Sequence, residues 1–281
     1  MKTNKNLKMI LIKKPYFLAR KKYIYFFTFC LFTIVFWNSC QSPLEEKIVS
    51  PLEKIKDEKV RTLLKKTFKK TGGLENWTNK KSIKFKKYFA LFDSLGNTEM
   101  SVNQIHEYNS SPNKAINIRW TKENKNHFLQ SKNGKITKTI NDQPDPTPNP
   151  TSLKNTVLSS TFVVNIPFNL LDDGIVLEYQ GIDTLNDGAV VEVLRADFNP
   201  EAHNNHSTKD TWWYYFDKKE HHLVGYLVKH ADHISYVKNL SFTEVDGFTF
   251  PVKRKSWRVT KDREILYLRA EYEYSDYEIE K

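Results

Sequence analysis

Cysteine is scarce in this chain, and its scarcity excludes several ways of stabilising a fold or holding a metal. Only Cys30 and Cys40 occur, and Cys30 lies inside an apolar run near the N-terminus. If export removes that run, Cys40 is left without an intrachain partner, so neither an internal disulfide nor a cysteine-based zinc site is expected. The remaining 242 residues are enough to bury a core without such cross-links.

Acidic residues are absent from the first 40 positions, whereas eight lysines and arginines lie among the first 22. A 15-residue apolar run (23–37) and then Asn38, Ser39 and Cys40 follow. A basic stretch, a short apolar core and a small residue before the cut are typical of an export signal. The run is shorter than the roughly 20 residues that a spanning helix needs, although snorkelling flanks leave an uncleaved membrane anchor as the alternative.

The segment 37–40 resembles a lipobox, although Trp37 stands where an aliphatic residue is usual. We therefore expect 1–39 to be a lipoprotein signal peptide and Cys40 to be the lipidated first residue of the mature protein. Residues 40–52, with two prolines, are expected to be a lipid-anchored tether. Removing the signal leaves 36 basic and 33 acidic residues, and a net charge of +3 does not indicate a nucleic-acid partner.

Catalytic motifs are also lacking, and the chain is not expected to be an enzyme or to need a cofactor. There is no nucleophile elbow, phosphate-binding glycine loop or dinucleotide fingerprint. Asp172 and Asp173 precede a glycine and indicate a turn, and Glu271 and Glu273 share a strand face that is expected to be solvated.

Histidines are the residues that could bind a metal, because several lie in pairs. His203 and His206 lie in a polar loop, His221 and His222 would point to opposite faces of a strand, and two more histidines, 230 and 233, flank an expected hairpin turn. Convergence on a metal would require these loops to meet in space. No metal site is therefore predicted, and a metal-dependent enzyme is the least favoured alternative.

The hydropathy pattern predicts a mainly β fold in which residues 53–281 form a single antiparallel β domain with an N-terminal helix. Apolar positions at helical spacing predict a helix over 53–71, which ends at a pair of glycines. From residue 83 the period becomes two, and turn signals at short intervals favour an antiparallel meander over a βαβ unit. The predicted strands are 83–91, 99–108, 115–121, 126–131, 135–140, 175–180, 189–198, 211–217, 222–231, 234–244, 248–260 and 264–275.

These strands are expected to form one strongly curved sheet, an incomplete barrel of about ten strands, with one or two short covering helices. The segment 141–150 contains four prolines and is predicted to be a loop, because proline cannot donate ladder hydrogen bonds. Residues 152–164 are expected to form one of the short helices.

Aromatic residues make up 14% of the chain, and the segment 212–216 (WWYYF) places them on both faces of one strand. One face must cover the core, and the other then needs a second apolar partner: a covering helix, a ligand or another protein. The candidates for a hydrophobic ligand site are Phe85, Phe89, Trp120, Phe168, Trp213 and Tyr215.

The segments 162–174 (FVVNIPFNLLDDG), 179–181, 214–217 and 245–251 (VDGFTFP) resemble an uncharacterised family of bacterial envelope lipoproteins, over roughly residues 70–275. More distantly, the chain is similar to the outer-membrane lipoprotein carrier and receptor group. That resemblance implies a helix, an incomplete antiparallel barrel and short helices over the open side, with acyl chains held in the apolar concavity. No binding residue can be carried over individually. Cys40 fits receptor-like members better, because a soluble carrier has no lipid anchor.

The sequence therefore predicts an envelope lipoprotein that binds a hydrophobic or amphiphilic ligand, an acyl chain or a lipoprotein, in a sheet concavity. A structural or interaction lipoprotein with a filled core is the alternative. Its membrane contact is expected through lipidated Cys40, in the outer membrane and facing the periplasm. Gln41 stands where an aspartate would retain the protein at the inner membrane, and the first acids, Glu45 and Glu46, come five residues after the cysteine. Exposure at the cell surface is the alternative.

Overall fold

The computed structural model describes residues 50–110, 113–199 and 210–281. The predicted signal peptide, Cys40, most of the tether and the pair His203 and His206 lie outside these ranges. None of the described helices is both long and apolar enough to cross a membrane.

In the described part of the chain, three short helices precede the sheet: η2 (Pro51–Lys54), α2 (Glu58–Thr71) and α3 (Leu74–Asn79). The side chain of Asp57 accepts hydrogen bonds from the first free backbone N–H groups of α2, so this helix begins after residue 57 and not at 53 as predicted. Its C-terminus is capped by Gly72 in the left-handed conformation, as predicted. One face of α2 is buried: Val60, Leu63, Leu64, Thr67 and Phe68.

Thirteen antiparallel strands form one sheet, and the twelve predicted strands are all present. The strands are β1 (Ser82–Phe92), β2 (Thr98–Asn109), β3 (Ala115–Lys122), β4 (Lys125–Lys132), β5 (Lys135–Ile140), β6 (Gln143–Pro144), β7 (Ile175–Thr184), β8 (Val190–Phe198), β9 (Thr211–Asp217), β10 (Leu223–Lys229), β11 (Ile234–Val245), β12 (Phe248–Val259) and β13 (Ile265–Glu280). The unpredicted strand, β6, has only two residues and lies inside the proline-rich loop.

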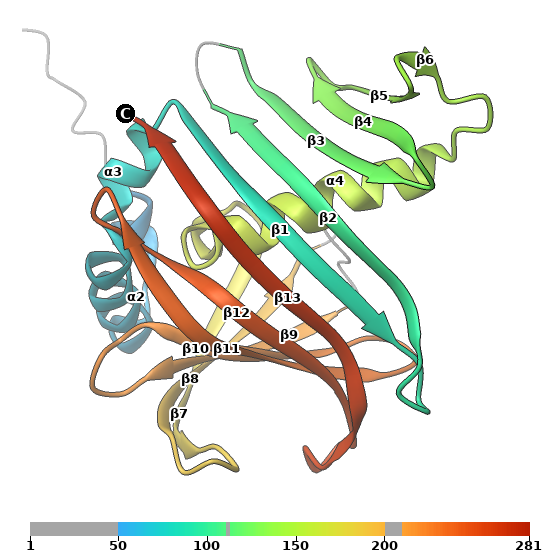
Figure 1. Cartoon of the computed structure of the whole chain (residues 1–281). Coiled ribbons are helices and arrows are strands. Elements are labelled where there is room, and N and C mark those ends of the chain that lie inside the picture. The colour runs from blue at the N-terminus through green and yellow to red at the C-terminus, as the bar shows by residue number, and fades with distance from the viewer. Residues whose placement is uncertain (1–49, 111–112, 200–209) are drawn as a thin grey trace, which may run out of the picture. The chain divides into compact units, whose positions relative to one another are not determined.

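The order of the strands shows how the two halves of the chain join. Across the sheet, the strands follow one another from β6 to β1, and β1 is followed by β13 and then by the strands down to β7. The first strand, β1, therefore pairs with the last strand, β13. Strands from both sides of the proline-rich loop thus belong to the same sheet (Figure 1). The sheet ends at β6 and β7, which do not pair with each other, and the predicted incomplete barrel is confirmed.

The connection between the two halves is a helix that crosses the concave face of the sheet (Figure 1). This helix, α4 (Pro150–Asn165), begins with Asn149 as its N-cap and is followed by η3 (Phe168–Leu171). Phe162 packs on Trp212 of β9 with ring centroids 4.9 Å apart, while Val157 packs with residues of β3 and β4. A helix that contacts strands so far apart in the sheet must lie inside its curve.

The strand 211–217 has aromatic side chains buried on both faces, as predicted. On the concave face, Trp212, Tyr214 and Phe216 join the main core with α2 and η3. On the convex face, Trp213 and Tyr215 join a second cluster, which the β7–β8 turn covers through Leu185 and Ala189 and which contains Val191, Val193, Val224, Leu227 and Val259. The convex face is therefore covered by neighbouring strands and a turn, and not by a helix.

Candidate functional site

The concave face is formed by alternate residues of adjacent strands, and their register defines a central row. Lys87 of β1 is paired with Tyr274 of β13 on one side and with Gln104 of β2 on the other. One step along the strand, Phe89 is paired with Tyr272 and Val102. Because side chains alternate across a strand, these six residues project from the same face as the buried Phe85.

The end of the concave face nearest α2 is packed with side chains. Phe85 is 1% exposed and stacks on His106, with ring centroids 4.9 Å apart. Phe168 is stacked between Phe68, at 5.3 Å, and Trp77, at 4.8 Å. The structure thus places two of the predicted ligand residues, Phe85 and Phe168, in a filled core.

The other end of the concave face is less covered. Phe89, Leu91 and Tyr272 are only half-buried, and the rings of Phe89 and Tyr272 lie 6.4 Å apart. Helix α4 crosses β1 and β13 nearer their opposite end (Figure 1). Half-buried aromatic and aliphatic side chains beside a concave surface can cover the chain of a ligand.

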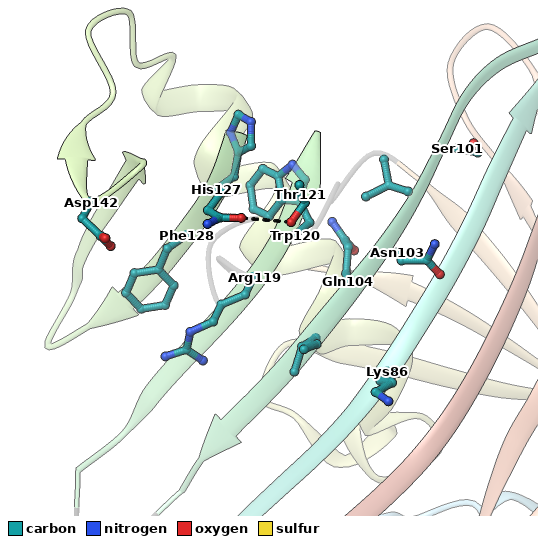
Figure 2. Close-up of a pocket in the computed structure, with 13 residues that line it drawn as sticks. Lys86, Ser101, Asn103, Gln104, Arg119, Trp120, Thr121, His127, Phe128 and Asp142 are labelled. Atoms are coloured by element: carbon teal, nitrogen blue, oxygen red, sulfur yellow. Dashed lines mark hydrogen bonds between the residues drawn. The ribbon is translucent and has the colours of Figure 1, made fainter. Parts of the chain in front are cut away.

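A cleft of about 920 Å³ lies next to this less covered end, where β2 separates from β3. The two strands are paired only from Gln104 to Asn109, so Thr98–Asn103 has β1 as its one partner strand among the described residues. Figure 2 shows Trp120 and His127 on one side of the cleft and Gln104 and Asn103 on the other. The cleft is bounded by residues of both sheet faces, and it therefore connects the concave face with the outside.

Trp120, another predicted ligand residue, lies in this cleft. It stacks on His127 with ring centroids 5.0 Å apart and an interplanar angle of 9°. Burial and the nearby Lys138 ammonium lower the pKa of His127, which disfavours the charged form of the ring. A stacked pair of rings offers a flat surface that an apolar or planar group can cover.

The concave face carries cationic groups that the sequence reasoning did not assign to a site. Arg254 is 4% exposed and Lys87 is half-buried, and burial together with the Arg254 charge lowers the pKa of Lys87 to about 8. His106, which is 1% exposed, has a pKa well below its usual value because of burial and the Lys87 charge. The sequence did contain a sign of such a site: Lys87 lies between Phe85 and Phe89, at a position where the alternation along the strand would place an apolar residue.

Trp213 and Tyr215 do not face the concavity, so they cannot belong to the same site as Phe89. They lie on the convex face, where Tyr215 lines a small pocket of about 180 Å³. The pocket also contains stacked rings of Tyr236 and Trp257, 5.8 Å apart. The alternation of side chains along the strand correctly predicted that Trp213 and Tyr215 share a face. It could not predict which face is concave, because that depends on how the sheet curves.

The remaining histidines and carboxylates are explained by turns and ion pairs. His221 and His222 lie in the β9–β10 turn and not in a strand, with His221 at a φ of 59°. His230 and His233 flank the β10–β11 turn, as predicted, and the first of them bonds Asp210 at 2.9 Å. In the described ranges no three histidine, cysteine or acidic side chains converge as a metal site would need.

Comparisons with known proteins give the fold but no closer relationship. No protein-family model and no curated protein matches the sequence. A LolA superfamily protein from Nitrosomonas europaea is similar in structure, with a TM-score of 0.51 and 9% identity, covering 79% of this chain and 93% of that chain. A DUF1329 family protein from Desulfovibrio piger has a TM-score of 0.49 and 10% identity, covering 73% of this chain and 88% of that one. The first likeness confirms the distant similarity to the lipoprotein carrier group at the level of fold.

Proposed function

We propose that this protein is a membrane-anchored, non-catalytic module that binds the acyl chain of an amphiphile on the concave face of its sheet. The observation that carries the proposal is the unequal covering of that face. Its α2 end is filled, whereas Phe89, Leu91 and Tyr272 at the other end are half-buried beside a cleft of about 920 Å³. Covering such half-buried apolar side chains with a ligand removes apolar surface from water, which lowers the free energy of the complex.

Two further arguments support the proposal. The resemblance to the lipoprotein carrier and receptor group implies acyl chains in a concavity of this kind, and the fold is shared with a LolA superfamily protein. The cleft between β2 and β3 gives a ligand a route to the concave face from outside. The ligand is therefore proposed to be a lipid or the acyl group of a lipoprotein.

The location of the protein is part of the same proposal. Cleavage before Cys40 and acylation of its thiol and amine would fix the chain in the outer membrane, with residues 50–281 facing the periplasm. Mass spectrometry of the protein recovered from membranes checks this directly. An acylated N-terminus at Cys40 is expected, and an intact Met1 in the native host would contradict it.

A titration with a fluorescent single-chain amphiphile, 11-(dansylamino)undecanoic acid, tests the binding face. Phe89→Ser removes an aromatic ring from the concave face, and Tyr88→Ser removes one from the neighbouring position on the other face. We expect Phe89→Ser to weaken binding by roughly tenfold, as the loss of a buried aromatic contact implies. Tyr88→Ser should leave the affinity within about twofold of the wild type. Equal effects of the two changes, or no binding by the wild type, would contradict the proposal.

The filled-core alternative, an interaction protein, is favoured by one observation. Thr98–Asn103 of β2 has a free hydrogen-bonding edge beside the cleft, to which an extended peptide could add as a further strand. This function predicts that a peptide, and not an amphiphile, protects the β2 amides of residues 98–103 from hydrogen exchange.

A further inference from the structure

Two cationic side chains on the concave face lie without a carboxylate beside them. They are Lys87 of β1 and Arg254 of β12, with β13 between their strands. The Arg254 charge lowers the pKa of Lys87, and the titratable side chains that affect the pKa of Arg254 are tyrosines of β10 and β13. No acidic side chain of the described ranges is among them.

Arg254 has a buried donor, its Nε–H, that the surrounding described side chains leave without an acceptor. Its Nη2 donates a hydrogen bond to the Tyr226 hydroxyl at 3.0 Å, and its guanidinium lies over the same ring, 5.5 Å from the centroid. The Nε–H is buried and has no acceptor among the described residues. A buried guanidinium donor without a partner is costly, and it marks a position where an acceptor is missing.

Lys87 approaches the same region from the less covered end of the face. Its Nζ lies 5.0 Å from the centroid of Phe89 and 5.5 Å from that of Tyr272, so aromatic rings surround the ammonium. These rings offer the ammonium a weak attraction, and Lys87 Nζ makes no hydrogen bond to another described residue. His106 is close enough for the charge of Lys87 to lower its pKa, and it supplies no negative charge.

The convex face of the same strands shows that the fold can pair its cations. Lys253 and Lys255 of β12 bind Glu273 and Glu271 of β13, at 3.3 and 2.7 Å. On the concave face the corresponding partners of Arg254 are tyrosines. Two like charges in a poorly solvated place repel each other and lose hydration, which lowers the stability of the protein unless an anion joins them.

We propose that Lys87 and Arg254 bind the anionic head group, a carboxylate or a phosphate, of an amphiphile whose chain lies along Phe89 and Leu91. The inference rests on the proposed function and adds the polar end of the ligand. The head-group oxygens would accept hydrogen bonds from Arg254 Nε and Lys87 Nζ, and the hydroxyl of Tyr226 keeps its own proton to donate.

A buried water explains only part of this arrangement. A cavity of about 30 Å³ touches Arg254 and Asn239, whose Oδ1 is also buried without a donor. One water would fit there and could satisfy both atoms. It would leave the two positive charges uncompensated, whereas an anion removes the repulsion between them.

Isothermal titration of the full chain in a neutral detergent separates the head group from the chain of the ligand. The probes are decanoate and decyl phosphate, the uncharged decanol, and the free anions acetate and phosphate. The variants are Lys87→Met, which keeps the length but removes the charge, Lys87→Arg, which restores it, and Lys84→Met as a control. Lys84 lies on the same strand but is exposed and paired with Glu278 at 3.0 Å.

We expect the two anionic amphiphiles to bind about tenfold or more tightly than decanol, as charge-assisted hydrogen bonds imply. Lys87→Met should remove this preference while decanol binding persists, which also shows that the variant is folded. Lys87→Arg and Lys84→Met should keep the preference. Equal binding of decanol and decanoate by the wild type would overturn the head-group site and leave the proposed function intact. An unchanged preference in Lys87→Met, or acetate binding as tightly as decanoate, would also overturn it. Failure of every amphiphile to bind would overturn the proposed function itself.

Discussion

Lys87 is a cationic side chain in a poorly solvated place beside a second cation, and its lowered pKa predicts how the stability of the protein depends on pH. Burial and Arg254 lower its pKa to about 8, whereas the unfolded chain has the ordinary lysine value of about 10.4. Below pH 8 both states are protonated, and the folded state carries the full cost of the charge. Between pH 8 and about 10.4 only the unfolded state keeps the proton, so the contribution of Lys87 to the free energy of unfolding rises with pH.

The variant Lys87→Met should therefore be more stable than the wild type in the absence of ligand. We expect a gain of about 1 kcal/mol at pH 7, discounted for the partial solvation of the ammonium, or a Tm higher by about 2–4 °C. Thermal melts from pH 7 to 10 should show the difference shrinking above pH 8. Lys80, whose pKa burial also lowers to about 8, titrates in both proteins and cancels in the comparison. A difference that is constant or grows with pH would show that Lys87 is not a strained cation.

At the scale of elements, the junction between α2 and the sheet depends on a single glycine. Gly72 has a φ of 119°, and a Cβ atom there would lie 2.4 Å from Cδ1 of Phe248 and 2.8 Å from the carbonyl oxygen of Gly247. Gly72→Ala should lower the free energy of unfolding by about 3 kcal/mol, from backbone strain and overpacking together. Gly96→Ala is the matched control, with a φ of 85° and no atom within 4 Å, and should cost about 1 kcal/mol. Equal losses in denaturant unfolding would contradict the proposed contact.

Local patterns predicted the elements well because strand and turn formation depend on neighbouring residues. The alternation of Ile83, Phe85 and Phe89 appears where the sequence places it. Strand β6 was missed because two residues that include a proline have no period. The helix was expected to begin at residue 53, but Pro51–Lys54 forms a separate short 3-10 helix and α2 begins only after Asp57.

The candidate site was less predictable, since it depends on contacts between residues distant in sequence. Whether Trp212 or Trp213 faces the concavity depends on the direction in which the sheet curves. The two halves of that sheet are joined by the pairing of β1 with β13, in which Ser82 lies opposite Glu280. That same pairing brings Lys87 of β1 and Arg254 of β12 to the two sides of β13, and no local spacing connects them. The sequence could therefore supply the aromatic residues of a site, but not the division between filled core, concave face and convex face.

At the scale of the whole molecule, the protein combines a proposed lipid anchor with an incomplete barrel and a partly covered concave face. The sequence likeness to known proteins is too low to transfer a function, so the ligand must be located directly. Two faces of the sheet compete for it: the less covered end of the concave face near Phe89, and the small convex pocket beside Trp257.

The most direct measurement is a crystal structure of the protein soaked with 10-bromodecanoic acid, with bromine located by its anomalous scattering. The account predicts a bromine position on the concave face, near Phe89 and Leu91, with density for the carboxylate close to Lys87 and Arg254. Bromine found only in the convex pocket, or no ordered bromine at concentrations that saturate binding in solution, would contradict the claim that this face holds an acyl chain.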